Sequence, residues 1–178
     1  VVVHAFYSDK FYKLLVTPDT ILISTQNIGL PNNIYPINAY GQSIFSEDGT
    51  NYAIEINDLT VELFDFDRCT GMLSDFIELP LADTMQNGDT LALTGSAFSP
   101  SGRYLYVASN NLIHQYDTEA PDIMLSEQVV AVWDTFLAPC CGGETVFFML
   151  QLAPDNRIYV SQSVGQNILH YIEFPDSL

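Results

Sequence analysis

Phe98-Ser99-Pro100-Ser101-Gly102-Arg103 places a hydrophobic and a small residue before a turn, and a β-rich run follows it. The same pattern recurs at Phe45-Ser46-Glu47-Asp48-Gly49-Thr50 and at Leu152-Ala153-Pro154-Asp155-Asn156-Arg157. Gly49 and Gly102 are 53 residues apart, and Gly102 and Asn156 are 54 apart. Such an interval is typical of one four-stranded sheet per repeat in a β-propeller.

Alternating apolar residues and turn residues predict the strands of each repeat. The middle copy predicts a complete blade with strands at 95–98, 104–108, 112–116 and 128–133. The first copy predicts 42–45, 52–56, 60–66 and 76–79, and the third predicts 148–152, 158–161 and 168–172 without a fourth strand. Residues 11–16 and 21–25 predict the last two strands of an earlier blade.

The expected fold is therefore all-β, a partial β-propeller of about three four-stranded blades that begins and ends in mid-blade. The single propeller segment 1–178 divides into the end of one blade with a linker (1–41), two blades (42–93 and 94–145) and an incomplete blade (146–178). A blade buries its faces only against neighbouring blades. We therefore expect the remaining blades to come from a longer polypeptide or from another chain.

Composition restricts the function classes. The chain has 22 acidic and 5 basic residues, a net charge of −17. Such a surface repels phosphate backbones and anionic membranes, so a nucleic-acid partner is not expected. Polar residues or Pro and Gly interrupt each apolar stretch, so no membrane-spanning helix is expected. Residues 1–4 carry no secretion signal, which is then expected to have been removed or to lie outside this sequence.

The three cysteines, Cys69, Cys140 and Cys141, match no zinc or redox spacing. We expect no metal site and no cofactor. One bridge from Cys69 to Cys140 or Cys141 would leave an odd thiol, whereas buried or free thiols would need no pairing. Both arrangements are open at the level of the sequence.

Three segments carry a family resemblance: Phe64-Asp65-Phe66-Asp67-Arg68-Cys69-Thr70-Gly71, the run 97–107 around the middle turn, and the run 151–160 around the third. They resemble the propeller region of large secreted surface proteins of Bacteroidota, which often carry PKD-type modules and a type IX secretion sorting domain. The resemblance implies an extracellular or cell-surface location and a display or adhesion role. It brings no established catalytic set.

A second feature agrees with that origin. Bacteroidota attach O-glycans at Asp-Ser/Thr followed by a small or aliphatic residue. Four such sites fall in predicted turns or loops, where a glycan could be accommodated. The candidate acceptors are Thr20, Thr84, Thr90 and Ser177.

Two clusters could carry chemistry. His114 and His170 lie on the third strands of successive blades, but neither has a further ligand at metal spacing, and we expect packing or edge positions. Asp65 and Asp67 would share one face of a strand, which could suit Ca²⁺ or acid–base work. We expect instead that Arg68 fixes the Cys-Thr-Gly turn that follows, through bidentate hydrogen bonds.

Other residues indicate architecture. Asp48-Gly49 and Asp155-Asn156 supply the left-handed position of a hairpin turn. Arg103 and Arg157 recur after the turn, which indicates a shared role in each blade. No hydrolase, nucleotide-binding or zinc-protease motif is present. Most aromatic residues are expected to pack between blades, and exposed ones would suit a carbohydrate or a protein. They are Tyr35, Tyr40, Tyr52, Tyr104, Tyr106, Trp133, Tyr159 and Tyr171.

The sequence thus favours a non-enzymatic, secreted or surface-held module for binding, adhesion or scaffolding, with a protein or a glycan as partner. One alternative is a metal-dependent propeller hydrolase of the lactonase or phytase kind, with the metal in a central channel. A second is a subunit of a larger envelope complex or filament, in which neighbouring chains cover the open blade faces.

Overall fold

The computed structural model describes residues 1–31, 42–56, 60–80, 93–139, 142–162 and 168–177. Over these ranges the chain is almost entirely β-structure, with one short 3-10 turn, η1 (Met124–Ser126). The described part contains no helix long and apolar enough to cross a membrane. The predicted all-β class is confirmed.

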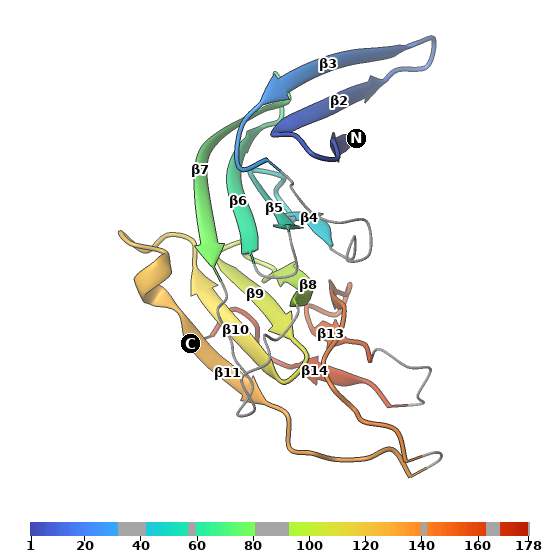
Figure 1. Cartoon of the computed structure of the whole chain (residues 1–178), viewed down its shortest axis with the longest axis vertical. Coiled ribbons are helices and arrows are strands. Elements are labelled where there is room, and N and C mark those ends of the chain that lie inside the picture. The colour runs from blue at the N-terminus through green and yellow to red at the C-terminus, as the bar shows by residue number, and fades with distance from the viewer. Residues whose placement is uncertain (32–41, 57–59, 81–92, 140–141, 163–167, 178) are drawn as a thin grey trace.

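The strands form four antiparallel sheets, which follow one another along the chain and are here called blades 1 to 4 (Figure 1). Blade 1 contains β1 (Val2–His4), β2 (Lys10–Val16) and β3 (Ile21–Asn27). Blade 2 contains β4 (Ser43–Phe45), β5 (Asn51–Ile56), β6 (Thr60–Asp67) and β7 (Met72–Pro80). Blade 3 contains β8 (Leu93–Phe98), β9 (Tyr104–Ser109), β10 (Leu112–Asp117) and β11 (Gln128–Val132). Blade 4 contains β12 (Leu150–Leu152), β13 (Ile158–Val160) and β14 (His170–Ile172).

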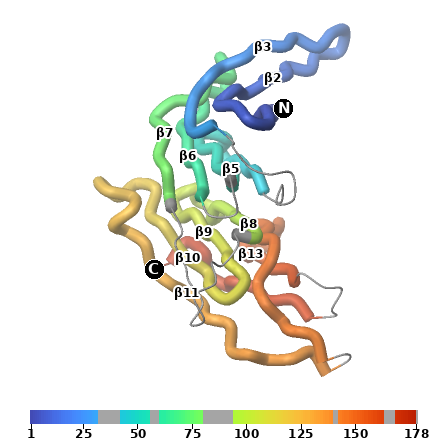
Figure 2. The backbone as a smooth tube through the Cα atoms, in the orientation of Figure 1, coloured from blue at the N-terminus to red at the C-terminus, as the bar shows by residue number. Residues whose placement is uncertain are grey.

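Strands pair in chain order within each blade, as in a propeller. The blades stack on one another through their first strands, because β8 contacts both β4 and β12. We therefore call β4, β8 and β12 the inner strands. The tube in Figure 2 shows this succession, with β7 and β11 on the side away from β4.

Blade 1 corrects one expectation. It has three strands in the described residues, and β1 precedes the two that were predicted. His4 pairs with Phe11 across a six-residue connection, as Phe45 pairs with Tyr52 in blade 2. The sequence concealed this copy because β1 is short and its turn has no Gly or Pro. Tyr7 takes the positive φ there, at 55°.

The predicted turns at the other three copies are confirmed. Gly49 and Gly102 have φ of 69° and 79°, which a glycine adopts without the steric cost of a Cβ. Asn156 takes the same region at 64°, as asparagine tolerates. The connection in blade 4 is one residue shorter, because Leu152 pairs with Ile158 whereas Phe98 pairs with Leu105.

The fourth strand of blade 2 begins earlier than predicted. β7 starts at Met72, directly after the turn, rather than at Phe76. Its pairing with β6 shifts register between Leu63 and Asp65, and Asp75 has a φ of 50°. A β-bulge thus absorbs Asp75, which has the character of a turn residue, inside the strand.

Apolar cores fill each space between blades. Leu63 and Leu79 of blade 2 meet Leu105 and Val107 of blade 3. Leu105 is fully buried, which stabilises the fold by about 1.5–3 kcal/mol relative to an exposed leucine. The remaining core residues are Ala53, Val61, Phe98 and Tyr116 between blades 2 and 3; Ala97, Tyr104, Tyr106, Ala108, Ile113, Phe147, Leu150, Ile158 and Val160 between blades 3 and 4; and Phe11, Tyr52, Phe64 and Leu73 between blades 1 and 2.

Two glutamines add directional bonds at the seams between blades. Gln26 of β3 donates through Nε2 to Leu73 O at 2.6 Å and accepts from Leu73 N at 3.1 Å. Gln42, just before β4, donates to Leu150 O at 2.8 Å and accepts from Ser96 N at 3.2 Å. Gln42 therefore joins blade 2 to blades 3 and 4.

Candidate functional site

A groove of about 780 Å³ opens where the three inner strands converge, and we call it the axial groove. Backbone and side chains of blades 2, 3 and 4 build it. It is lined by Gln42, Ile44, Phe45, Glu47, Ser96, Ala97, Phe98, Leu150, Gln151, Leu152, Ala153, Pro154 and Asn156.

Close backbone packing joins blades 3 and 4 next to the axial groove. A Cβ on Gly95 of β8 would lie 2.6 Å from Met149 Cα and 2.7 Å from Phe148 O. Only a residue without a side chain allows β8 to approach blade 4 this closely. The amide bridge of Gln42 lies beside this contact.

Polar groups in the axial groove differ in how they are satisfied. The Ser96 side chain is fully buried, and its Oγ has no hydrogen-bond partner among the described residues. Buried hydroxyls are usually paired, but this one has no exposed surface, so its natural partner is an internal water rather than a ligand in the groove. Glu47, Gln151 and Asn156 are exposed on the groove, beside the half-exposed ring of Phe45. The site therefore combines an apolar face with amide and carboxylate groups.

The Asp65–Asp67–Arg68 cluster lies away from the axial groove. Asp67 fixes the turn, since its Oδ1 accepts from Cys69 N at 2.8 Å and its Oδ2 from Thr70 Oγ1 at 2.7 Å. These bonds hold the pKa of Asp67 below its ordinary value. The expectation that Arg68 makes this turn is wrong, because its side chain turns back toward Gly49. Partial burial, with Asp75 nearby, raises the pKa of Asp65.

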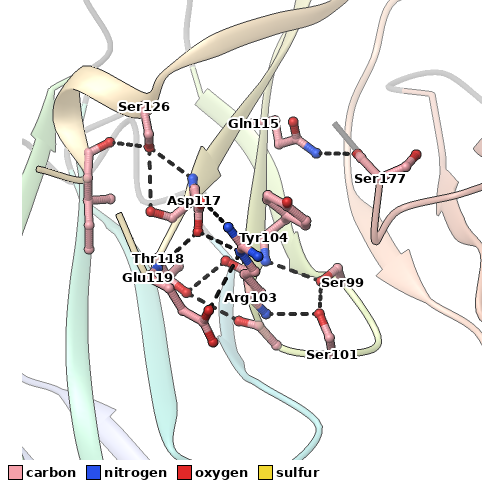
Figure 3. Close-up of polar contacts among 12 residues, drawn as sticks. Ser99, Ser101, Arg103, Tyr104, Gln115, Asp117, Thr118, Glu119, Ser126 and Ser177 are labelled. Carbon is pink, nitrogen blue, oxygen red and sulfur yellow. Dashed lines mark hydrogen bonds and ion pairs between the residues drawn. The ribbon is translucent and has the colours of Figure 1, made fainter. Parts of the chain in front are cut away.

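Arg103 and Arg157 do share a role. Arg103 forms a bidentate pair with Asp117, with Nε to Oδ1 at 3.0 Å and Nη2 to Oδ2 at 2.7 Å (Figure 3). Arg157 donates to Glu173 Oε1 at 3.2 Å in blade 4. The hydrogen bond from Arg103 lowers the pKa of Asp117. Each arginine thus joins the start of a second strand to the end of the third.

The two histidines do not meet. His114 is buried on β10, with Nδ1 2.7 Å from Glu127 Oε1. His170 Nε2 lies 2.9 Å from Thr145 O, and its ring packs edge-on against Phe147. Both have structural surroundings in their own blades. In the ranges that the structure covers, no three His, Cys, Asp or Glu side chains gather as a metal-binding group.

Cys69 is a free, exposed thiol in the Asp67 turn. Cys140 and Cys141 lie outside the described residues, as do Tyr35 and Tyr40. Among the other aromatic residues, Tyr52, Tyr104 and Tyr106 are buried between blades, as expected. Trp133 packs against the blade 3–4 core, Tyr159 is half-buried, and Tyr171 is 53% exposed.

The structure describes two of the four predicted glycan acceptors, Thr20 and Ser177. Thr20 is exposed at the β2–β3 turn, whereas Thr84 and Thr90 lie outside the described residues. Ser177 is exposed in a segment that packs on blade 3, where its carbonyl accepts from Gln115 Nε2 at 3.0 Å (Figure 3). Burial in this contact raises the pKa of Tyr106, whose hydroxyl donates to Pro175 O, to about 12.

Sequence reasoning missed the axial groove. Gln42, Ser96 and Gln151 carry no local motif, and only the fold brings them together. The available signal was positional: each lies at or next to the predicted first strand of a blade, the strand that lines a propeller's centre.

No protein-family model matches the sequence, and no curated protein matches it. Solved structures do resemble the fold. A putative 6-phosphogluconolactonase from Bacteroides uniformis gives a TM-score of 0.55 at 14% identity, over 96% of this chain and 49% of that one. The Cps50 (Swd1) β-propeller domain of Myceliophteria thermophila gives 0.53 at 14%, over 93% and 47%. A luciferin-regenerating enzyme gives 0.52 at 16%, over 86% and 44%.

These similarities identify the fold class. The chain is a partial β-propeller, and it spans less than half the length of each of these three structures. At such identities the shared architecture says nothing of activity, because propellers host many unrelated functions.

Proposed function

We propose that the chain is part of a non-enzymatic binding propeller and that the axial groove is its ligand-binding surface. The carrying observation is a groove built by the inner strands of three blades that presents the exposed side chains of Phe45, Glu47 and Gln151. An aromatic ring beside amide and carboxylate groups suits the apolar face and hydroxyls of a sugar. A glycan is therefore the preferred ligand class, and a protein surface the other.

The proposal includes an extracellular or cell-surface location. Its support is the resemblance of 64–71, 97–107 and 151–160 to secreted Bacteroidota propellers and the exposure of two predicted glycan acceptors, Thr20 and Ser177. The remaining blades would come from the same polypeptide or from another chain. Intact-mass and peptide mapping of protein from its native host would reveal glycans at Thr20, Thr84, Thr90 or Ser177. Unmodified peptides at all four would refute that part.

A glycan array followed by calorimetric titration of each hit tests the groove. Glu47→Ala and Gln151→Ala remove exposed polar groups and should weaken binding at least fivefold without unfolding the chain. Glu119→Ala, on an acid 69% exposed outside the groove, is the control and should bind as the parent does. Binding that ignores both groove variants would refute the site.

A lactonase-like hydrolase is the second candidate, favoured by the likeness to the B. uniformis putative lactonase fold. A central metal would need several oxygen or nitrogen ligands. The described part of the axial groove offers Glu47 as its carboxylate and otherwise amides, at Gln42, Gln151 and Asn156, and these do not make a complete set. Metal analysis together with a lactone hydrolysis assay separates the two candidates: stoichiometric metal with turnover would favour the hydrolase.

A further inference from the structure

The outer edge of blade 1 differs from that of blades 2 and 3. In blade 2 the third strand, β6, pairs with the fourth, β7, and in blade 3 β10 pairs with β11. In blade 1 the third strand, β3, pairs with β2 and with no further strand in the described residues. An unpaired strand edge is a template for another strand.

The pairing register shows which backbone groups are free. Thr17 N bonds to Thr20 O and Ile28 N to Asp9 O, so the bonded positions of β3 are even-numbered. Because antiparallel positions alternate, Ile21, Ile23 and Thr25 direct their N–H and C=O groups away from β2. These groups form a row along the open edge.

Side chains around this edge are apolar and exposed to solvent. Ile21 is 54%, Leu22 57% and Ile23 66% exposed, and on β2 Leu15 and Val16 are equally open. The corresponding strands of blade 3, β9 and β10, are buried at most positions. Contiguous exposed aliphatic residues of this kind mark an interaction surface.

A groove of about 350 Å³ lies over the face of blade 1, from Val1 and Val2 across to β3, and we call it the hairpin groove. Its walls are Leu15, Leu22 and Ile23 from the β2–β3 hairpin and the Arg68–Gly71 turn of blade 2. It also contains Lys13 and Arg68, two of the five cations of a chain with net charge −17. Positive charge is therefore concentrated where apolar surface is exposed.

Neither cation has a carboxylate within ion-pair distance among the described residues. Lys13 is 7% exposed, and its Nζ contacts Gln26 Oε1 at 3.2 Å and Met72 Sδ at 2.9 Å. Arg68 is exposed, and the pKa of Asp48 is lowered mainly by the hydrogen bond from Ser46, with Arg68 as the last of its causes. A buried ammonium without a counter-ion gains from an acidic partner group.

We infer that blade 1 accepts an extended strand from a partner protein, with aliphatic residues on both sides of an acidic one, along the β3 edge and the hairpin groove. The backbone row would give affinity through strand addition, and the acidic residue would set the register against Lys13 and Arg68. The acceptor is a sheet edge at the periphery, so this partner is separate from any ligand of the axial groove.

The test uses the whole chain and a fluorescent nine-residue peptide of alternating valine and threonine with glutamate at its centre. Saturable anisotropy binding is expected, with slowed hydrogen exchange at Ile21, Ile23 and Thr25. A peptide with proline next to the glutamate should lose binding at least tenfold, since it lacks a ladder donor. A peptide with glutamine in place of the central glutamate should bind about fivefold more weakly than the glutamate peptide.

Variants of the protein complete the test. Arg68→Gln changes an exposed residue and should weaken peptide binding about fivefold, and Lys13→Met more than tenfold. Arg157→Gln, a matched arginine in blade 4, should bind as the parent does. Alkylation of Cys69, which also lines the hairpin groove, should slow when peptide is bound and so reports occupancy without any mutation.

Three results would overturn the inference. One is failure of the peptide to bind the folded chain. Another is protection of Cys69 by octanoate but not by the peptide, which would assign the hairpin groove to a small amphiphilic anion. The third is dimerisation in sedimentation experiments with protection of β3 in the absence of peptide, which would assign the edge to a second copy.

Discussion

Blade 3 and blade 1 contain the same hairpin in opposite surroundings. β9 is buried at all six positions, whereas β3 is exposed at six of its seven. Both are rich in β-branched, aromatic or leucine residues, and both pair in register with the neighbouring strand. Position in the array, rather than strand composition, decides which one forms core.

The comparison explains where stability lies. Blade 3 packs against a blade on each side, while blade 1 has one neighbour in the described structure. Blades of a repeat array contribute stability mainly through such interfaces. Blade 1 should therefore open first and blade 3 last.

The largest expected effect comes from matched leucines. Leu105→Ala in blade 3 should lower the free energy of unfolding by about 3 kcal/mol, because it leaves a cavity in a closed core. Leu15→Ala in blade 1, at a site 62% exposed, should cost less than about 0.5 kcal/mol. Urea unfolding of both variants measures this difference. Equal losses would mean that blade 1 is covered in solution.

The second effect is a pH dependence at the seam of blade 1. Glu62 of β6 is fully buried; its Oε1 accepts from Leu30 N at 2.6 Å, and Gly29 packs against the carboxyl. Burial raises the pKa of Glu62 from 4.5 to about 7, helped by Glu78 across the strand pair. The folded state therefore binds this proton more tightly than the unfolded state. The stabilisation is complete below about pH 4.5 and is lost as pH rises to about 7.

Glu62→Gln should accordingly be more stable than the parent at pH 8 by about 2 kcal/mol and nearly equal to it at pH 5. Hydrogen exchange should show the change in β2 and β3, with β9 unaffected. Glu78→Gln, at an exposed site, removes only the smaller cause of the raised pKa of Glu62 and should reduce the pH dependence less than Glu62→Gln does. A parent protein equally stable at both pH values would contradict this assignment.

The third effect concerns Gly95. Gly95→Ala places a Cβ within 2.6 Å of the backbone of Met149, so blade 4 must shift, at a cost of about 2 kcal/mol. Exchange should rise in β12 and β13 and stay unchanged in blade 1. Ser96→Ala, which removes a buried hydroxyl without a protein partner, is the neighbouring control and should keep or slightly raise stability.

The smallest effect is expected from the surface arginines. Arg103→Gln breaks an exposed pair and should shift the urea midpoint only slightly, with the shift vanishing in 1 M salt. The pKa of Asp117 is lower in the folded state than in the unfolded state. The pair therefore stabilises the fold at pH values above the ordinary pKa of an aspartate, and this stabilisation is lost as pH falls through the folded pKa. A large, salt-resistant loss would show that this pair holds the blade closed.

Much of the fold followed from local chemistry. Turn residues such as Gly49, Gly102 and Asn156 tolerate the left-handed region better than other residues do, so they locate three of the hairpins correctly. The first hairpin of blade 1 was not predicted because Tyr7, a residue type that is not typical of turns, takes the left-handed conformation there. β7 began too late in the prediction because Asp75 marks a bulge in a strand rather than a turn between strands.

The sites were less accessible to sequence reasoning. Ser96 and Gln42 acquire meaning only when β4, β8 and β12 converge, and those contacts link residues far apart in the chain. The Arg68 prediction failed because Asp67 lies closer to the amides of its own turn. Charge and spacing identified the right segment but not which side chain bonds there.

The glutamine bridges have a consequence for the pitch of the array. Apolar contact is non-directional and would allow one blade to slide along the next. A side-chain amide holds one donor and one acceptor at fixed spacing, and a slip by a single residue, about 3.3 Å, would break both bonds. Gln26 and Gln42 thus fix the position of one blade along the next, and they oppose a progressive shift of successive blades along the central axis.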